Sequence, residues 1–253
     1  MNRHCFPMAL ISTFALGAGC GSSTIGGKVE TTGSAASGSA SAGVTSLPSR
    51  PCTAANTSTA PTDGLIADFA DVDSMGIEIS GGIISWAAPK AVNPAAPTYT
   101  TSGGALTITV NLSPTSTPQF VGTMVFFNKC IDASAFSGVQ FTVSGSLSGC
   151  QMQYATGDVA HQDVTLGSAY ATGPAGSYAP QIIIGADALT STARTIKVPF
   201  GRSDNPGSPA TAIDPTKLIF TQWQFTVPVA PQDDGGVDLC TGSVRVDDVR
   251  FYH

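Results

Sequence analysis

The sequence predicts an all-β protein, a two-sheet β-sandwich or jelly roll, and three observations lead to this prediction. Charged residues make up only 11% of the 253 residues, against about 25% in ordinary soluble domains. Glutamate occurs only at Glu30 and Glu78, although Glu and Lys normally fill helical surfaces. Short apolar or alternating segments are separated by turn sequences rich in Gly, Ser, Asp and Pro. Strands whose outer faces carry Ser and Thr account for all three observations.

The expected strands follow one another from residue 65 to residue 252. In Ala105–Leu112, apolar side chains at every second position alternate with Thr and Asn, which is the pattern of a strand with one buried face. The segment Gly138–Ser144 alternates in the same way. In Ser243–Tyr252 the alternation places Val244 and Val246 on one face together with Asp248 and Arg250. In chain order the strands are expected at Leu65–Phe69, Ile77–Trp86, Ala105–Leu112, Phe120–Phe127, Gly138–Ser144, Gln151–Thr156, Thr195–Pro199, Leu218–Val227 and Ser243–Tyr252.

Residues 1–20 are expected to form an export signal. The apolar run Cys5–Gly19 is too short to span a bilayer and ends in small residues, as a signal peptide does. The segment Leu16–Cys20 resembles a bacterial lipobox, which implies that Cys20 is lipidated. Gly21 follows instead of Asp, which by enteric-type sorting implies an outer-membrane lipoprotein with the lipid anchor as its membrane contact. Cleavage and simple secretion is the alternative.

Residues 21–61 are expected to be a flexible linker, because Gly, Ser, Thr and Ala dominate this stretch and cannot bury a core. The β-sandwich domain is then expected over residues 62–253. This length is sufficient for a sizeable core.

The cysteines are consistent with export. Cys5 leaves with the signal, and four remain in the mature chain beyond the candidate lipid site. An even number in an exported chain predicts disulfides, and four cysteines allow three connectivities. Zinc is disfavoured because no CxxC spacing occurs. The preferred pairing is Cys130–Cys150, which closes a local loop, with Cys52–Cys240 fastening the start of the domain to its end.

Segments at both ends and in the middle of the domain resemble a known fold. They are Leu65–Asp71, Cys130–Phe141, Asp214–Phe225 and Ser243–Tyr252, and they are similar to motifs of the galactose-binding-like jelly roll. Many carbohydrate-binding modules share this fold, and similar domains occur in lipid-anchored surface proteins of bacteria. The resemblance covers residues 62–253, and its short motifs describe a fold better than a function.

The resemblance implies a structural calcium site where the first and last strands meet. The matching carboxylates are Asp68 and Asp71 at the start and Asp247 and Asp248 at the end. Carboxylate oxygens are ligands that calcium prefers, and bringing such groups together without a cation is costly. The alternative is that they face water or cap turns by accepting hydrogen bonds from backbone amides.

Sugar binding needs aromatic platforms and planar polar side chains. Gln151 and Gln153 share one face of an expected strand, and Gln222 and Gln224 share one face of another. If these strands are neighbours, the four amides form a polar face. Trp86, at a strand end, is the candidate aromatic platform, whereas Trp223 is expected in the core.

Several function classes are disfavoured. The net charge of −6 and the pI near 4.8 leave no basic surface for nucleic acid. A glycosidase needs two carboxylates, and Glu78 is the only Glu of the domain. A catalytic triad needs a histidine, and only His161 and His253 lie beyond the signal.

The sequence therefore predicts an exported, lipid-anchored, non-catalytic domain that binds a polysaccharide or a cell-surface glycan. The alternatives are a surface structural or protein-interaction lipoprotein without a glycan ligand and, with less support, a glycan hydrolase. An exposed aromatic residue beside the glutamines would favour glycan binding.

Overall fold

The computed structural model describes residues 52–70, 80–88, 94–115, 117–161, 179–185, 187–202, 204, 213–227 and 239–253. No helix within these ranges is long and apolar enough to cross a membrane. The elements are η1 (Ala54–Asn56), β1 (Thr57–Thr59), β2 (Leu65–Ala67), β3 (Ser80–Ala88), β4 (Thr98–Thr101), β5 (Leu106–Leu112), β6 (Gln119–Asp132), β7 (Gly138–Ser148), β8 (Gln151–Asp158), β9 (Gln181–Ile184), β10 (Arg194–Pro199), β11 (Leu218–Val227) and β12 (Cys240–Tyr252).

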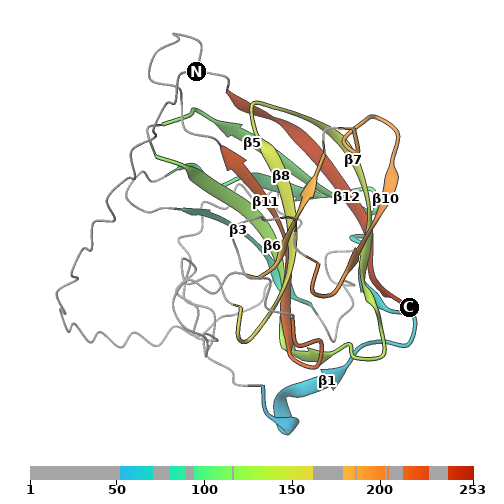
Figure 1. Ribbon diagram of the computed structural model, residues 1–253. Coiled ribbons are helices and arrows are strands. Elements are labelled where there is room, and N and C mark those ends of the chain that lie inside the picture. Colours follow the sequence, from blue (N-terminus) through green and yellow to red (C-terminus); the bar gives the residue numbers. More distant parts are fainter. Residues whose placement is uncertain are drawn as a thin grey trace, which may run out of the picture. The chain divides into compact units, whose positions relative to one another are not determined.

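The strands form two sheets that pack face to face (Figure 1). Sheet A has the order β1–β6–β11–β8–β9, and β3 also pairs with β6. Sheet B has the order β10–β7–β12–β5–β4, and β2 also pairs with β12. Within the described strands, β1 and β6 are parallel and the other pairs are antiparallel. This arrangement confirms the all-β, two-sheet fold class.

The core lies between the sheets and is built by the alternation of side chains along each strand. Along β5 the even-numbered residues from Leu106 to Leu112 are buried, as their sequence pattern predicts. Phe141 of sheet B contacts two side chains of sheet A, with its ring centroid 4.7 Å from that of Tyr154 and 5.7 Å from that of Trp223. Trp223 is fully buried here, which confirms its expected place in the core.

A β-bulge in β12 changes the expected alternation near the C-terminus. Asp248 has a φ of 49°, a left-handed conformation that Asp tolerates better than most residues, and the pairing with β7 shifts between Asp247 and Arg250. The extra residue turns Val249 and Phe251 into the core beside Val246, because a bulge reverses the faces of the residues that follow it.

Three strands lack an expectation from the sequence. β1 lies within the segment expected to be linker, where Thr57–Thr59 pairs with Cys130–Asp132 of β6. β4 and β9 are four-residue strands, and β4 carries mainly Thr. β1 and β4 are polar, and β9 buries Ile182 and Ile184 but has only four residues, so periodicity in the sequence does not reveal these strands.

The expected disulfide pairing is wrong, because the structure joins Cys52 to Cys130 and Cys150 to Cys240, with Cα–Cα distances of 5.5 Å and 4.9 Å. Cys130 lies near the end of β6, where β1 brings Cys52 alongside. The 11 residues of β7 then extend about 35 Å along the sandwich. Cys150, which follows β7, therefore lies too far from Cys130 to form a disulfide with it. The pairing of Ser148 with Thr241 brings Cys150 beside Cys240.

A buried polar cluster joins β8 to β11 inside the core. The Thr221 hydroxyl donates to the Tyr154 hydroxyl at 2.6 Å, and Thr156 Oγ1 lies 2.8 Å from the same oxygen. Burial raises the pKa of Tyr154 well above its ordinary value, so the phenol stays neutral. Tyr154 also lies opposite Trp223 in the strand register. The cluster therefore ties the two strands together at a fixed register.

The Tyr154→Phe substitution is expected to lower the free energy of unfolding by about 1–2 kcal/mol, because two buried threonine hydroxyls lose a partner. Urea unfolding with the disulfides intact measures this change. Tyr252→Phe, on the half-exposed last strand, serves as the control and is expected to change stability by less than about 0.5 kcal/mol. Equal stabilities of the wild type and Tyr154→Phe would contradict a structural role for the cluster.

Candidate functional site on the outer face of sheet A

Every second side chain of sheet A points away from sheet B, and we call this surface the outer face. The strand register places its residues in rows that run across the strands. The first row is Ile183, Gln153, Gln224, Gly122 and Trp86; the second is Gln181, Ala155, Gln222, Met124 and Ile84; the third is Gln151, Thr226 and Phe120. The structure thus brings the four glutamines expected from the sequence onto one face and adds Gln181.

The glutamine side chains bond to one another in a chain that we call the glutamine ladder (Gln151, Gln153, Gln224 and Gln181). Gln224 Nε2 donates to Gln153 Oε1 at 3.1 Å, and Gln181 Nε2 donates to Gln224 Oε1 at 3.3 Å. A longer contact of 3.4 Å joins Gln153 Nε2 to Gln151 Oε1. Gln151 is exposed, whereas Gln153 and Gln181 are half-buried. Gln224, which joins Gln153 to Gln181, is buried at 5% exposure. The ladder therefore presents the amide of Gln151 and parts of those of Gln153 and Gln181 at the surface.

The aromatic residue predicted as a platform is on this face but is not exposed. Trp86 is only 2% exposed, so its expected exposure is wrong. Its indole lies against Gly122, where an added Cβ would come within 2.8 Å of the ring atoms Cε2 and Cζ2. A ring that packs onto a glycine of the neighbouring strand loses its exposed surface. The position of Trp86 at a strand end does not reveal this contact, because the glycine belongs to another strand.

Phe120 is the exposed aromatic residue of the outer face. It lies opposite Thr226 on β11, which itself lies opposite Gln151 on β8, and it is 37% exposed. The sequence predicted Phe120 only as the first residue of a strand and gave no indication of its exposure. Its exposure depends on the cross-strand neighbours, which are the small Thr226 and the edge of β3.

The described residues of the three rows include no charged side chain. Arg202 and Asp204 form an ion pair at 3.2 Å beside β9, where Asp204 also accepts a hydrogen bond from the Ile183 N–H. The described residues of the three rows thus offer amides, apolar groups and one exposed aromatic ring, without a formal charge.

The carboxylates predicted to hold calcium bond to nearby donors in the structure. Asp68 accepts a hydrogen bond from the Ala70 N–H at 3.1 Å. Asp247 accepts from the Asp248 N–H at 2.7 Å and lies 3.6 Å from Arg245, while Asp248 forms an ion pair with Arg250. Asp71 lies outside the described residues. Within the described ranges no group of three His, Cys, Asp or Glu side chains could hold a metal ion, and calcium stays a prediction.

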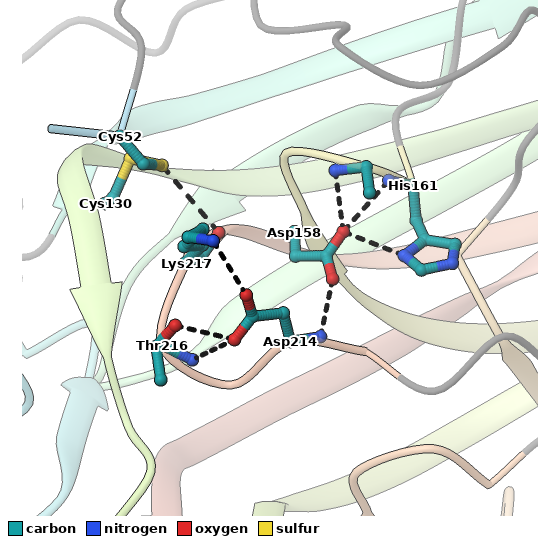
Figure 2. A network of polar contacts seen from close by, with 8 residues as sticks. Cys52, Cys130, Asp158, His161, Asp214, Thr216 and Lys217 are labelled. Atoms are coloured by element: carbon teal, nitrogen blue, oxygen red, sulfur yellow. Dashed lines mark hydrogen bonds and ion pairs between the residues drawn. A yellow bond between two sulfur atoms is a disulfide. The ribbon is translucent and has the colours of Figure 1, made fainter.

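A second polar network lies at the far end of β8 and is shown in Figure 2. The carboxylate of Asp158 is fully buried and accepts the N–H groups of Ala160 at 2.8 Å, His161 at 2.9 Å and Asp214 at 2.6 Å. The Nδ1 atom of His161 lies 2.8 Å from the same carboxylate. The network joins the end of β8 to the segment that enters β11. His161 follows β8 and is buried.

Asp214 continues this network toward solvent. It accepts the Thr216 hydroxyl at 2.6 Å and lies 3.1 Å from Lys217 Nζ. The hydrogen bond from the Thr216 side chain is the main cause that lowers the pKa of Asp214 below its ordinary value. A carboxylate with a lowered pKa stabilises the fold above its ordinary pKa, and this contribution is lost as the pH falls through the lowered value.

No family model matches the sequence, and no curated protein matches it. Solved structures with a similar fold include the family 11 carbohydrate-binding module of a cellulosomal cellulase of Clostridium thermocellum, with 14% identity and a TM-score of 0.43 over 74% of this chain and 92% of that chain. A module specific for non-crystalline cellulose has 14% identity and a TM-score of 0.37 over 78% and 98%. An exo-β-agarase has 10% identity and a TM-score of 0.40 over 74% and 25%. These likenesses concern the architecture, so the function is inferred from the side chains.

The Asp158→Asn substitution is expected to lower the free energy of unfolding by about 2–4 kcal/mol. The substitution replaces a buried carboxylate, which accepts hydrogen bonds from several N–H groups, with a neutral amide. The NH2 group of this amide then faces some of the same N–H donors. Thermal or urea unfolding measures the change, with Asp187→Asn in an exposed turn as the control. Similar stabilities of the two variants would show that the network does not hold β8 to β11.

Chelation tests the calcium prediction. If calcium joins the two ends of the domain at Asp68, Asp71, Asp247 and Asp248, EGTA removes a ligand of the native state and lowers the melting temperature. The melt is recorded with added calcium and with excess EGTA, and magnesium serves as the control cation. Identical melting temperatures in the two conditions would contradict the prediction.

Proposed function

We propose that the outer face of sheet A binds a neutral glycan and that the domain is a non-catalytic binding domain. The observation that carries this proposal is the glutamine ladder beside the exposed ring of Phe120. Sugar hydroxyls donate and accept hydrogen bonds, as the amides of glutamine do. The C–H faces of a sugar ring pack on aromatic side chains. The face supplies both kinds of contact next to each other.

The size of the face suits an oligosaccharide. The strands β9, β8, β11 and β6 lie side by side, and three strand spacings amount to about 14 Å. This width exceeds that of one sugar ring. A chain lying across the strands would contact Ile183 at one side, the ladder in the middle and Phe120 at the other side.

The absence of charge within the three described rows supports a neutral ligand. A carboxylated or sulfated glycan would place its charge over amides on a protein of net charge −6, and no cation of the rows would pair with it. The same rows hold no carboxylate pair of the kind that glycoside hydrolysis requires. A binding role therefore fits this face better than a catalytic role.

The two disulfides indicate an extracytoplasmic protein. We place the domain at the cell envelope, with a lipidated Cys20 as the anchor and the Gly/Ser-rich segment after it as the tether. The lipobox-like sequence Leu16–Cys20 supports this placement. An outer-membrane position follows from Gly21 under enteric-type sorting, and secretion without lipid is the alternative.

Polysaccharide pull-down tests the proposal. Insoluble cellulose, agarose and immobilised mixed-linkage β-glucan serve as neutral probes, and alginate and polygalacturonate serve as anionic probes. We expect retention on at least one neutral probe that persists at high salt, because no ion pair contributes. Retention on none of them would contradict glycan binding and would favour a structural or protein-interaction role.

The Phe120→Ala substitution is expected to lower the affinity for the retained neutral glycan about tenfold, since an aromatic contact contributes about 1.4 kcal/mol. Stability should change little, because the ring is 37% exposed. Isothermal titration calorimetry measures the affinity. Leu239→Ala is the matched control, because Leu239 is 50% exposed but precedes β12 of sheet B. Equal affinities of the two variants would contradict the assigned role of Phe120.

A further inference from the structure

Two buried polar atoms on the outer face have no hydrogen-bond partner within the described part of the chain. They are the donor Nε1 of Trp86 and the acceptor Oε1 of Gln222. Trp86 is 2% exposed and Gln222 is 3% exposed. A buried donor or acceptor without a partner costs about 1–3 kcal/mol, so each such atom calls for a physical explanation.

The two atoms belong to strands on either side of β6. Trp86 of β3 lies opposite Gly122, and Gln222 of β11 lies opposite Met124. Because the Trp86 ring lies over Gly122 with Cε2 in contact range, and Cε2 is bonded to Nε1, the indole N–H reaches over β6. The Trp86 indole thus lies in the row of Gln224, and Gln222 lies in the neighbouring row on the other side of β6.

The third unpartnered atom, Nε1 of Trp223, has a different environment. Trp223 lies between the sheets, with its ring centroid 5.7 Å from that of Phe141 in an edge-on arrangement and 5.9 Å from that of Tyr154. Aromatic faces can receive an N–H group weakly. Trp86 and Gln222 instead supply one unpartnered donor and one unpartnered acceptor from neighbouring rows of the outer face, and a hydroxyl group can both accept and donate.

We propose that Trp86 Nε1 and Gln222 Oε1 form a hydroxyl-binding subsite that extends the glutamine ladder. One sugar hydroxyl accepts a hydrogen bond from Trp86 and donates one to Gln222. This inference rests on the proposed function and deepens it by naming the chemical group that the subsite selects. A carboxylate or sulfate has no proton to donate to Gln222, and an ammonium has no lone pair for Trp86. At this position the subsite therefore selects a hydroxyl group over a carboxylate, sulfate or ammonium group.

The burial of both atoms determines how a ligand reaches them. Neither side chain presents more than a few per cent of its surface, so a hydroxyl enters through a local opening of the face. The exposed Gln151 and Phe120 form the first contact, and the subsite is occupied afterwards. Binding is then expected in two kinetic steps, the second independent of ligand concentration.

The two tryptophans of the chain make a selective experiment possible. Protein labelled with ¹⁵N-tryptophan gives two indole signals, and Trp86→Phe assigns them. The protein is titrated with mixed-linkage β-glucan oligosaccharide, cello-oligosaccharide and agaro-oligosaccharide. With the oligosaccharide that binds, we expect the Trp86 indole proton to shift downfield while the Trp223 signal stays in place.

Calorimetry in the same samples separates the possible failures. Heat of binding with an unmoved Trp86 signal would overturn the subsite and leave the proposed function intact. No heat with any of the three oligosaccharides, together with no retention in the pull-down, would overturn both. A shift of the Trp86 and Trp223 signals to the same extent would indicate a general rearrangement and would also overturn the subsite.

A pair of buried glutamines provides a second test. Gln222→Met removes an unpartnered oxygen, so it is expected to leave the melting temperature unchanged or raised and to lower glycan affinity about tenfold or more. Gln119→Met is the matched control, because Gln119 is also 3% exposed but donates to the Ser113 carbonyl at 2.7 Å. We expect this control to lose stability and keep its affinity. A Gln222→Met variant that loses stability and keeps its affinity would show a structural role and overturn the proposal.

Discussion

The pairing of β8 with β11 determines where the residues of the candidate site lie. Gln153 lies opposite Gln224 and Tyr154 lies opposite Trp223, so neighbouring residues of the same two strands serve the outer face and the core. A slip of one residue would exchange these faces completely. The hydroxyl cluster around Tyr154 inside the core and the buried carboxylate of Asp158 at the strand ends both act on this pairing. The proposed ligand-binding surface thus depends on polar contacts in the core and at the strand ends, away from the ligand itself.

The two faces of sheet A differ in how their polar groups are hydrogen-bonded. On the inner face, the hydroxyls of Tyr154, Thr156 and Thr221 satisfy one another, and Trp223 Nε1 lies among aromatic rings without a hydrogen-bond partner in the described residues. On the outer face, the ladder satisfies part of its amides, while Trp86 Nε1 and Gln222 Oε1 lack partners within the described residues. A protein evolved for stability alone gains nothing from buried unpaired groups. Their position beside the glutamine ladder supports the proposed binding role.

Composition, turn sequences and alternation predicted the fold class, and alternation placed each pair of glutamines on one face of its own strand, whereas the pairing of the two strands stayed a condition that the structure meets. The period of two in Ala105–Leu112 and the i, i+2 spacing of Gln222 and Gln224 reflect local geometry, which the chain carries in any strand. Contacts between distant segments were not predictable in this way. The pairing of β1 with β6 decides the Cys52–Cys130 bridge, and β1 has no apolar pattern. The burial of Trp86 depends on Gly122, and the exposure of Phe120 depends on Thr226, which are cross-strand relations.

The central claim is that the outer face of sheet A is a surface for a neutral glycan. A crystal structure of the protein with the oligosaccharide that it binds in solution tests this claim most directly. We expect a sugar chain lying across β8 and β11, with a ring stacked on Phe120 and hydroxyls bonded to Gln153 and Gln224. A sugar bound on sheet B or at the loops, with the glutamine ladder unoccupied, would contradict glycan binding on the outer face of sheet A.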